Sequence, residues 1–256
     1  MDGTLLYHEN EHDIPHIHEE TKKVLREVQA KGHLIFIATG RPYAFLDKDV
    51  IDFGFDGYVL ANGAAVIYHD QVLVHHPLDH ERVEDMVNKL EERQIEYTMQ
   101  TIDYSYLKKD FKILDMFYHR CGVNFDYIQY EFSPKDHFHD TIKLEMMPMS
   151  EENIEYCRSL EDDYFDRMGE PPFNMEFYAR ERSKAIGILE VLKTLDIPIE
   201  DSYAFGDGKN DIEMLETVGH GIAMGNASEE VKKHAKEVCL SCFENGVAKK
   251  LTELFL

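Results

Sequence analysis

Two closely spaced aspartates, Asp207 and Asp211, are the residues of this 256-residue sequence whose pattern is best suited to chemistry. The apolar, aromatic run at 203–205 predicts a buried strand, and Gly206 and Gly208 permit a sharp turn at its end. We therefore expect Asp207 at the carboxyl end of the strand and Asp211 in the first turn of the next helix. Carboxylates this close repel each other unless a proton or cation intervenes, and Mg²⁺ prefers such oxygen ligands. The alternative is an Asp-rich helix start without a metal, because Asp is also a common helix cap.

Thr39 and Lys184 are candidates for binding an anion. Thr39 and Gly40 follow the apolar run 33–38, which predicts a strand buried on both faces, and a hydroxyl with nearby backbone N–H groups can cradle phosphate. Lys184 lies at the start of a predicted helix, 183–195, where a cation opposes the helix dipole unless an anion is nearby. The alternatives are an ordinary strand–turn–helix corner for Thr39 and a solvated side chain for Lys184.

The cysteine and histidine patterns are weaker signals. Cys239 and Cys242 form a C-x-x-C pair, but a structural zinc site needs four ligands, and Cys121 and Cys157 are distant in sequence. Zinc or redox chemistry is therefore the less favoured interpretation of the pair, whose role stays open. Six histidines in polar segments are expected on a wet surface rather than in a metal site: His8, His12, His16, His18, His137 and His139.

The composition indicates a folded, acidic protein. Hydrophobic residues make up 43% of the chain, and 50 Asp and Glu residues against 27 Lys and Arg residues give a net charge of -23. This charge disfavours nucleic acid and anionic membranes as partners, so an anionic substrate would need a metal or a local basic pocket. The sequence has no apolar run of membrane-spanning length and no signal-peptide pattern. We expect a cytoplasmic protein, monomeric or a weak homodimer, that binds neither nucleic acid nor membrane.

The order of the predicted elements divides the chain into two parts. Near both ends, strands alternate with helices, as expected for an α/β fold: helix 19–31, strand 58–61, hairpin 64–75, strand 221–224 and helices 211–218, 228–236 and 246–254. Between residues 78 and 180 the elements mix without this spacing: helices 81–93 and 150–160, and strands 95–100, 141–147 and 173–178. We predict a Rossmann-like parallel-sheet core from residues 1–77 and 181–256, with an inserted α+β cap from 78–180. Residues 104–130 could not be placed.

Seven short motifs together resemble the haloacid dehalogenase (HAD) superfamily of phosphatases, in particular its Cof-type branch with an α/β cap. In chain order they are DGTL at 2–5, IATGRP at 37–42, NGA at 62–64, SK at 183–184, GDGKNDIEML at 206–215, GIAMGNA at 221–227 and NGVA at 245–248. They span nearly the whole chain, and only the interior of the predicted cap has no motif to compare.

The resemblance implies a Mg²⁺-dependent phosphatase that acts on a small phosphorylated metabolite, a sugar or cofactor phosphate, through an aspartyl-phosphate. Asp2 would be the general acid and base and would give its backbone carbonyl to the metal. Thr39 would bind the transferring phosphoryl group and Lys184 would neutralise its charge. The remaining residues that the resemblance assigns are the metal ligands Asp207 and Asp211 and the substrate-binding residues Gly40, Arg41, Asn62 and Asn210. The cap would set substrate specificity by closing over the cleft.

One position departs from the family pattern, Asp-x-Asp-Gly-Thr, whose first Asp is the nucleophile. Met1 fills the x position here, so the nucleophile and its strand would precede the sequence. Either the natural protein is longer and has Asp immediately before Met1, or the chain lacks the covalent step. We favour the first alternative because the other catalytic positions match, and we expect the 256-residue form to have little or no activity.

Two rival functions stay open on the sequence. A phosphomutase of the same superfamily would transfer the phosphoryl group to a second hydroxyl instead of to water. A non-catalytic metabolite-binding or regulatory protein would keep ligand affinity without turnover.

Overall fold

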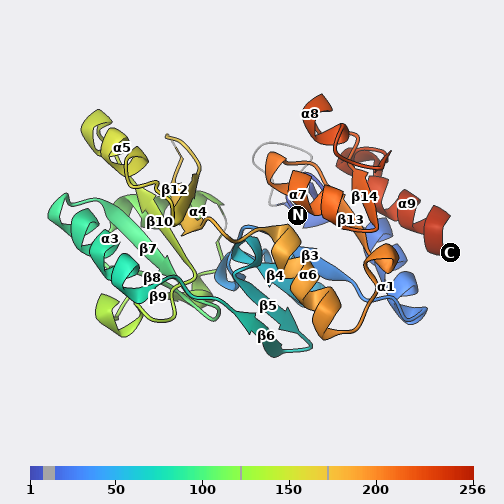
Figure 1. Ribbon diagram of the computed structural model, residues 1–256, viewed down its shortest axis with the longest axis horizontal. Helices are drawn as coiled ribbons and strands as arrows, with labels where there is room; N and C mark the ends of the chain where they lie inside the picture. Colours follow the sequence, from blue (N-terminus) through green and yellow to red (C-terminus); the bar gives the residue numbers. More distant parts are fainter. Residues whose placement is uncertain (8–14, 122, 172) are drawn as a thin grey trace.

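The computed structural model describes residues 1–7, 15–121, 123–171 and 173–256, which form two lobes (Figure 1). One lobe is built on a six-stranded sheet from residues 96–179, and the other holds a four-stranded and a three-stranded sheet. The N-terminal segment adds a small antiparallel pair, β1 (Leu6–Tyr7) and β2 (His16–Ile17). None of the helices in the described ranges is long and apolar enough to cross a membrane.

The three-stranded sheet is parallel, and the segment with Asp207 and Asp211 follows its first strand. Its order is β13 (Tyr203–Gly206), β14 (His220–Ala223) and β15 (Glu237–Val238). Buried Ala204, Met214 and Leu215 belong to one apolar cluster of this sheet. The helices of this part of the chain are α6 (Lys184–Thr194), α7 (Ile212–Thr217), α8 (Glu229–Lys232) and α9 (Gly246–Phe255).

The helix predicted at 228–236 is shorter than expected. It begins where Ser228 accepts a hydrogen bond from the Val231 N–H, but α8 ends at Lys232. The reason is competition from the sheet, because the Lys236 N–H donates to the Gly221 carbonyl at the edge of β14. The chain must therefore leave the helix before it enters β15.

The four-stranded sheet has the order β3 (Phe36–Ala38), β4 (Gly57–Leu60), β5 (Ala65–Tyr68) and β6 (Gln71–His75). β3 and β4 are parallel, and β5 and β6 form the predicted hairpin. The strand predicted at 33–38 begins only at Phe36, because the Ile35 N–H donates to the Asp56 carboxylate. Two helices complete this part of the chain: α1 (Glu19–Ala30), which packs on α9, and α2 (Lys48–Phe53).

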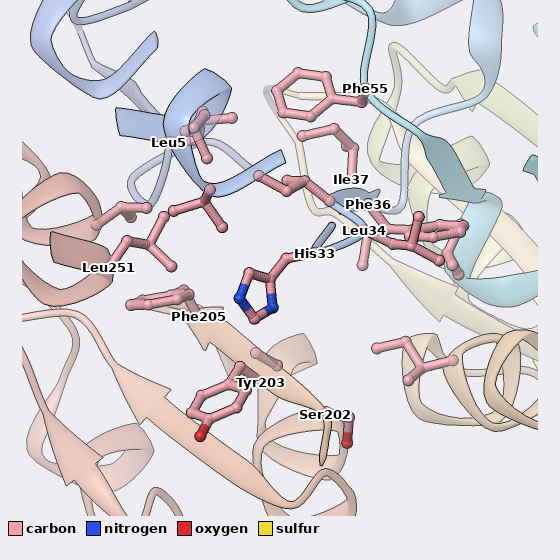
Figure 2. A pocket seen from close by; sticks show the side chains of 18 of the residues that line it. Leu5, His33, Leu34, Phe36, Ile37, Phe55, Ser202, Tyr203, Phe205 and Leu251 are labelled. Atoms are coloured by element: carbon pink, nitrogen blue, oxygen red, sulfur yellow. The ribbon is translucent and has the colours of Figure 1, made fainter. Parts of the chain in front are cut away.

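An apolar groove of about 460 Å³ separates β3 from β13 (Figure 2). β3 pairs with β4 and β13 pairs with β14, and neither strand pairs with another described strand on its groove side. Apolar side chains from both sides line the groove, among them Leu34, Ile37, Phe55, Phe205 and Leu251. Met1 and Thr4 also line it.

The six-stranded sheet has the order β11-β12-β10-β7-β8-β9 and is antiparallel except for the β8–β9 pair. Its strands are β7 (Glu96–Gln100), β8 (Ser105–Leu107), β9 (Ile128–Gln129), β10 (Lys143–Met147), β11 (Phe165–Met168) and β12 (Met175–Ala179). Side chains alternate between the two faces of a strand. Tyr97, Met99 and Phe177 pack in one cluster with buried residues of α3 (His80–Glu92) and α5 (Glu151–Arg158).

The opposite face of this sheet carries polar side chains and α4 (Lys112–Cys121), where the hydroxyls of Thr98 and Tyr118 lie 2.7 Å apart. β8, α4 and β9 occupy the segment that the sequence did not place. The whole sheet falls within the predicted cap, 78–180, but the status of that range as a separate domain stays a prediction.

Candidate active site

Asp207 lies directly after β13, as the sequence predicts. Asp211 lies directly before α7 and not in its first turn, because it closes a 3-10 turn, Lys209–Asp211, before the helix begins at Ile212. The backbone N–H groups of Asp207 and Gly208 both donate to Oδ2 of Asp211 at 3.0 Å, so this carboxylate closes the turn. A Cβ at Gly206 would lie 2.6 Å from the Cβ of Asp211, which explains why the turn needs glycine there.

Lys184 forms a buried ion pair with Asp211. Its Nζ lies 2.7 Å from Oδ1 of Asp211, and each side chain is only 5% exposed. Burial alone would raise the pKa of Asp211, but the Lys184 ammonium and the Met1 amino group outweigh burial and lower it. Lys184 is thus buried and not solvated, which rules out the alternative interpretation of this residue. The Asp211 carboxylate is the anion that lies beside the start of α6.

The N-terminal residues enter the same site. The Thr4 hydroxyl donates to Oδ1 of Asp207 at 2.5 Å, and Gly3, at φ +70°, lies so close that an added Cβ would be 2.3 Å from Oδ2. Burial, reinforced by the charge of Asp211, raises the pKa of Asp207. The Met1 amino group is buried among these charges, and burial together with Lys184 lowers its pKa. The contact of Thr4 with Asp207 was not predicted from the sequence, although the DGT motif includes Thr4.

Thr39 follows β3 directly and is 3% exposed. Its hydroxyl oxygen accepts a hydrogen bond from the Arg41 N–H at 3.1 Å, which leaves the hydroxyl proton to be donated elsewhere. The Arg41 guanidinium lies 2.7 Å from Oδ1 of Asp2 and 3.0 Å from Oδ2 of Asp47. Arg41 therefore fixes the Asp2 carboxylate, and Asp47 is a supporting residue that no motif indicated.

A second cavity, of about 250 Å³, lies beside Lys184. Three predicted site residues line it: Asn62, Lys184 and Asn210. Asn62 is 4% exposed, and its Oδ1 has no hydrogen-bond partner among the described residues. Gly40 lies next to it, since a Cβ on Gly40 would be 3.0 Å from Oδ1 of Asn62.

Residues of the six-stranded sheet form the opposite wall of this cavity. Asp166 and Met168 come from β11, Tyr178 from β12, and Arg180 directly follows β12. The two lobes also touch where Nζ of Lys143 donates to the Gly40 carbonyl at 3.0 Å. These residues were not predicted from the sequence, because alternate positions of an amphipathic strand carry no recognisable motif.

The acidic pair suits a hard cation only in combination with other oxygen ligands. The charge of Asp211 contributes to the raised pKa of Asp207, and a divalent cation would offset this repulsion. Within the described ranges, however, no three His, Cys, Asp or Glu side chains gather to form a metal cage. Both oxygens of Asp211 are already bonded, to Lys184 and to backbone N–H groups. Asp207 with backbone and phosphate oxygens therefore fits Mg²⁺ better than a protein-only cage does.

The cysteine pair and the histidines lie in ordinary surroundings where they are described. Burial raises the pKa of Cys239 to about 11, and Cys242 is buried, so neither thiol is poised as a thiolate. His137 lies 3.4 Å from an oxygen of Asp140. His8 and His12 fall outside the described residues.

Comparison with known proteins gives matches over nearly the whole chain. A family model described as haloacid dehalogenase-like hydrolase matches residues 1–251. YkrA of Bacillus subtilis (strain 168) is 31% identical over 265 residues, which cover 100% of this chain and 96% of YkrA. The 5-amino-6-(5-phospho-D-ribitylamino)uracil phosphatase YitU of the same organism is 27% identical, with 100% and 95% covered.

Solved structures agree with these matches. The sugar phosphatase BT4131, of HAD subclass IIB, superposes with a TM-score of 0.75 at 26% identity, over 94% of this chain and 96% of that protein. TM0651 from Thermotoga maritima has a TM-score of 0.84 at 21% identity, over 98% and 94%, and shows the shared fold alone. The resemblance and the α/β fold with a Rossmann-like core, both predicted from the sequence, are confirmed.

Proposed function

Because the chain belongs to the haloacid dehalogenase-like hydrolase family, we propose that it is a Mg²⁺-dependent phosphatase that hydrolyses the phosphate ester of a small metabolite. The observation that carries the proposal is the buried Lys184–Asp211 pair beside Asp207 at the carboxyl end of β13, the edge of an α/β sheet where ligands bind. Relatives named as phosphatases of small metabolites, YitU and the HMP-PP phosphatase of Yersinia pseudotuberculosis, support it. The cytoplasmic location and the monomeric or weakly dimeric state stay predictions.

The charge of the cavity beside Lys184 also supports an anionic substrate. Four basic residues line it, Arg180, Arg182, Lys184 and Lys209, against three acidic ones, Asp166, Glu181 and Glu213. In the whole chain the balance is reversed, with 27 basic against 50 acidic residues. Each of the four cations is paired with a carboxylate, but the lining is far less acidic than the chain as a whole, which would lower the cost of binding an anion there.

In the proposed reaction, a carboxylate attacks phosphorus while the ester P–O bond breaks, and the leaving oxygen takes a proton from Asp2. Water then attacks the aspartyl-phosphate and gives a proton to Asp2, which releases inorganic phosphate and restores the carboxylate. Arg41 orients Asp2, the Thr39 hydroxyl donates to the phosphoryl group, and Lys184 offsets its charge. The family pattern places the attacking carboxylate immediately before Met1.

Asp207 would hold the metal together with the backbone carbonyl of Asp2, and Asp211 would support Asp207 through the turn that its carboxylate closes. When bound, Mg²⁺ supplies positive charge that stabilises the charge on the transferring phosphoryl group. Lys184 shares that task, since its ammonium group lies in the same buried cluster.

The test of the function is phosphate release from a panel of phosphorylated metabolites, with Mg²⁺ or with EDTA. It is run on a chain extended before Met1 by an apolar segment that ends in Asp. We expect release from at least one small monoester with Mg²⁺ and none with EDTA. Transfer to a second sugar hydroxyl without release would favour the phosphomutase, and ligand binding without any turnover would favour the non-catalytic protein.

Calorimetric titration of Mg²⁺ tests the metal ligands separately. We expect Asp207→Ala to abolish Mg²⁺ binding and Asp211→Ala to weaken it less, because the Asp211 oxygens are already bonded. Asp163→Ala, at an exposed aspartate of the other lobe, is the matched control and should bind Mg²⁺ like the unmodified chain. Unchanged affinity in Asp207→Ala would rule out the assignment.

A further inference from the structure

We propose that Lys143 of β10 is a positioning residue of the reaction: through the Gly40–Arg41 peptide it orients the Thr39 hydroxyl toward the phosphoryl group. Lys143 acts on the loop 39–41, which follows β3, and not on the substrate. The inference rests on the proposed phosphatase function for the role of Thr39. It adds a residue of the six-stranded sheet to the residues that serve this reaction.

Lys143 lies on the face of the six-stranded sheet that is turned away from α3 and α5. Its neighbour Leu144 pairs with Phe177, and both belong to the apolar cluster that includes those helices. Side chains alternate between the two faces of a strand, so Lys143 projects from the other face. There its Nζ lies 3.0 Å from the carbonyl oxygen of Gly40. Lys143 thereby links this sheet to the loop that carries Thr39.

The ammonium group of Lys143 is held in a fixed direction. Lys143 is only 1% exposed, and its Nζ lies 2.8 Å from a carboxylate oxygen of Glu176 on β12. A buried charge is costly unless it is paired and hydrogen-bonded. Moving the ammonium group away from Gly40 would therefore break a charge-assisted hydrogen bond that it needs.

The Gly40–Arg41 peptide unit is held at both ends. Its carbonyl oxygen accepts a hydrogen bond from Lys143, and its N–H group, which belongs to Arg41, donates to Oγ1 of Thr39 at 3.1 Å. A trans peptide unit is planar, and its C=O and N–H bonds point in opposite directions. Fixing the carbonyl therefore also fixes the N–H, and a rotation that broke the contact with Lys143 would turn the N–H away from Thr39.

The hydrogen bond from Arg41 determines what the Thr39 hydroxyl can donate to. A hydroxyl has one proton to donate and accepts hydrogen bonds at its lone pairs. With the Arg41 N–H bound at the oxygen, the proton points away from the Gly40–Arg41 peptide and can be donated to a phosphoryl oxygen. A donor that is already oriented stabilises the transition state more than one that must first turn. Lys143 thus serves the reaction by holding this hydroxyl ready.

The other two carbonyls of the loop are held within their own lobe. The Asn62 N–H donates to the Thr39 carbonyl, and the Ala61 N–H donates to the Arg41 carbonyl, both at 3.1 Å. The Gly40 carbonyl between them receives its hydrogen bond from the six-stranded sheet. The orientation of this middle peptide is therefore the part of the loop that depends on the contact between the two lobes.

Hydrogen exchange of backbone amides in the 256-residue chain, measured by NMR, tests the orientation of the peptide without requiring turnover. The variant Glu176→Gln is compared with the double variant Glu176→Gln/Lys143→Met, so that the loss of Lys143 leaves Glu176 with no unpaired charge. At pH 6 the other nearby carboxyl group, Glu145, is mostly neutral, because its pKa is raised to about 7 by burial. The two proteins then differ in Lys143 alone.

We expect the Arg41 amide to exchange about tenfold faster in the double variant, a factor that corresponds to about one hydrogen bond. The Thr39 amide, which donates to the Val59 carbonyl at 2.9 Å, should exchange at the same rate in both proteins. Lys89→Met in the unmodified chain is the matched control, since Lys89 forms an ion pair with Asp85 on the surface of α3. It should leave the exchange of the Arg41 amide unchanged.

Phosphate release by the chain extended before Met1 tests whether the peptide acts through Thr39. In the Glu176→Gln background, Lys143→Met should lower kcat about tenfold, because the hydroxyl is no longer oriented. When Thr39 is also replaced by valine, the same change should lower kcat by less than about twofold, since no hydroxyl is left to orient. A merely structural role of Lys143 would lower kcat by the same factor in both backgrounds.

The outcomes separate this inference from the proposed function. Equal exchange of the Arg41 amide in the two proteins would overturn the positioning role of Lys143. Equally faster exchange of the Thr39 and Arg41 amides, or an equal loss of kcat with and without the Thr39 hydroxyl, would overturn it as well. No phosphate release from any ester by the extended chain would count against the phosphatase, and exchange of the Arg41 amide would still decide whether Lys143 orients the loop.

Discussion

The two lobes differ in how completely their sheets are built. In one lobe, six strands follow one another without a break, and every interior strand pairs on both sides. In the other, β3 and β13 face each other across an apolar groove of about 460 Å³. Apolar surface left in contact with water costs about 25 cal/mol per Å². The first lobe therefore satisfies its own core, whereas the stability of the second depends on what lies between β3 and β13.

The groove also ends at the candidate active site. Met1 and Thr4 line the groove, and the Met1 amino group is buried beside Asp207, Asp211 and Lys184. A residue joined to Met1 would thus start within the site, and a strand leading to it would have β3 and β13 as neighbours. In this lobe, a strand that filled the groove would also bring a residue into the candidate active site.

The largest expected effect comes from filling the groove. We predict that a chain extended before Met1 by a five-residue apolar segment and a final Asp unfolds at a higher temperature and gains phosphatase activity. Each apolar side chain that becomes buried contributes about 1.5–3 kcal/mol. A positioned nucleophile and its metal site should raise the rate by about 10³-fold or more. Thermal unfolding and Mg²⁺-dependent phosphate release are the measurements.

The matched control is the same extension ending in Asn instead of Asp. It should keep the gain in stability and lose the gain in activity, because the Asn amide is a poor nucleophile. If the 256-residue chain alone turned over as fast as the Asp-terminated extension, the coupling between groove and chemistry would be wrong.

The sequence predicted the residues whose local pattern is distinctive. The position of Asp207 follows from a strand, a glycine turn and a helix, which are consecutive in the chain. The groove could not be predicted, because it depends on how β3 and β13, separated by more than 160 residues, are spaced across the core. The positions of Asp166 and Tyr178 could not be predicted for a related reason. Only the strand register shows that these two residues share a face of the sheet with Met168. The length of α8 was wrong because a sheet contact of Lys236 overrides helix propensity.

The two lobes also differ in the direction in which they shift the pKa of a buried carboxyl group. In the groove-containing lobe, Asp211 has a lowered pKa because Lys184 and the Met1 amino group outweigh burial. In the six-stranded sheet, burial, followed by the charge of Glu176, raises the pKa of Glu145 to about 7, and Lys143 only partly offsets them. One lobe stabilises a buried carboxylate, and the other stabilises a carboxylic acid.

We predict that Lys184→Met destabilises the protein by about 3–5 kcal/mol, because it leaves the Asp211 carboxylate buried without its main partner. Chemical denaturation at pH 7 measures the loss. Lys209→Met is the control, since Lys209 pairs with Glu230 on the surface at 2.9 Å and both side chains are more than half exposed; it should cause no comparable loss of stability. Equal losses in the two variants would show that the Asp211 carboxylate does not depend on Lys184 for its compensation.

The smallest expected effect is a pH dependence from Glu145. Its pKa rises from the usual 4.5 to about 7 on folding, so between these values the folded protein binds more protons than the unfolded chain. Stability from this group is therefore fully present below about pH 4.5 and is lost as the pH rises through about 7. Asp211 contributes in the opposite sense, because its lowered pKa removes stability only as the pH falls below its usual 3.8.

Glu145→Gln should remove the loss of folding stability that occurs as the pH rises through about 7. The reason is that an amide keeps the shape of the neutral carboxyl group and does not titrate. At about 1.4 kcal/mol per pKa unit, the variant should gain on the order of 3 kcal/mol relative to the unmodified protein between pH 5 and pH 8. Denaturant unfolding at the two pH values measures this difference. Glu131→Gln, at a side chain that is 89% exposed, should show no such gain. If Glu145→Gln behaved like Glu131→Gln, the six-stranded sheet would hold Glu145 as a carboxylate, as the other lobe holds Asp211, and the contrast between the lobes would not extend to their buried charges.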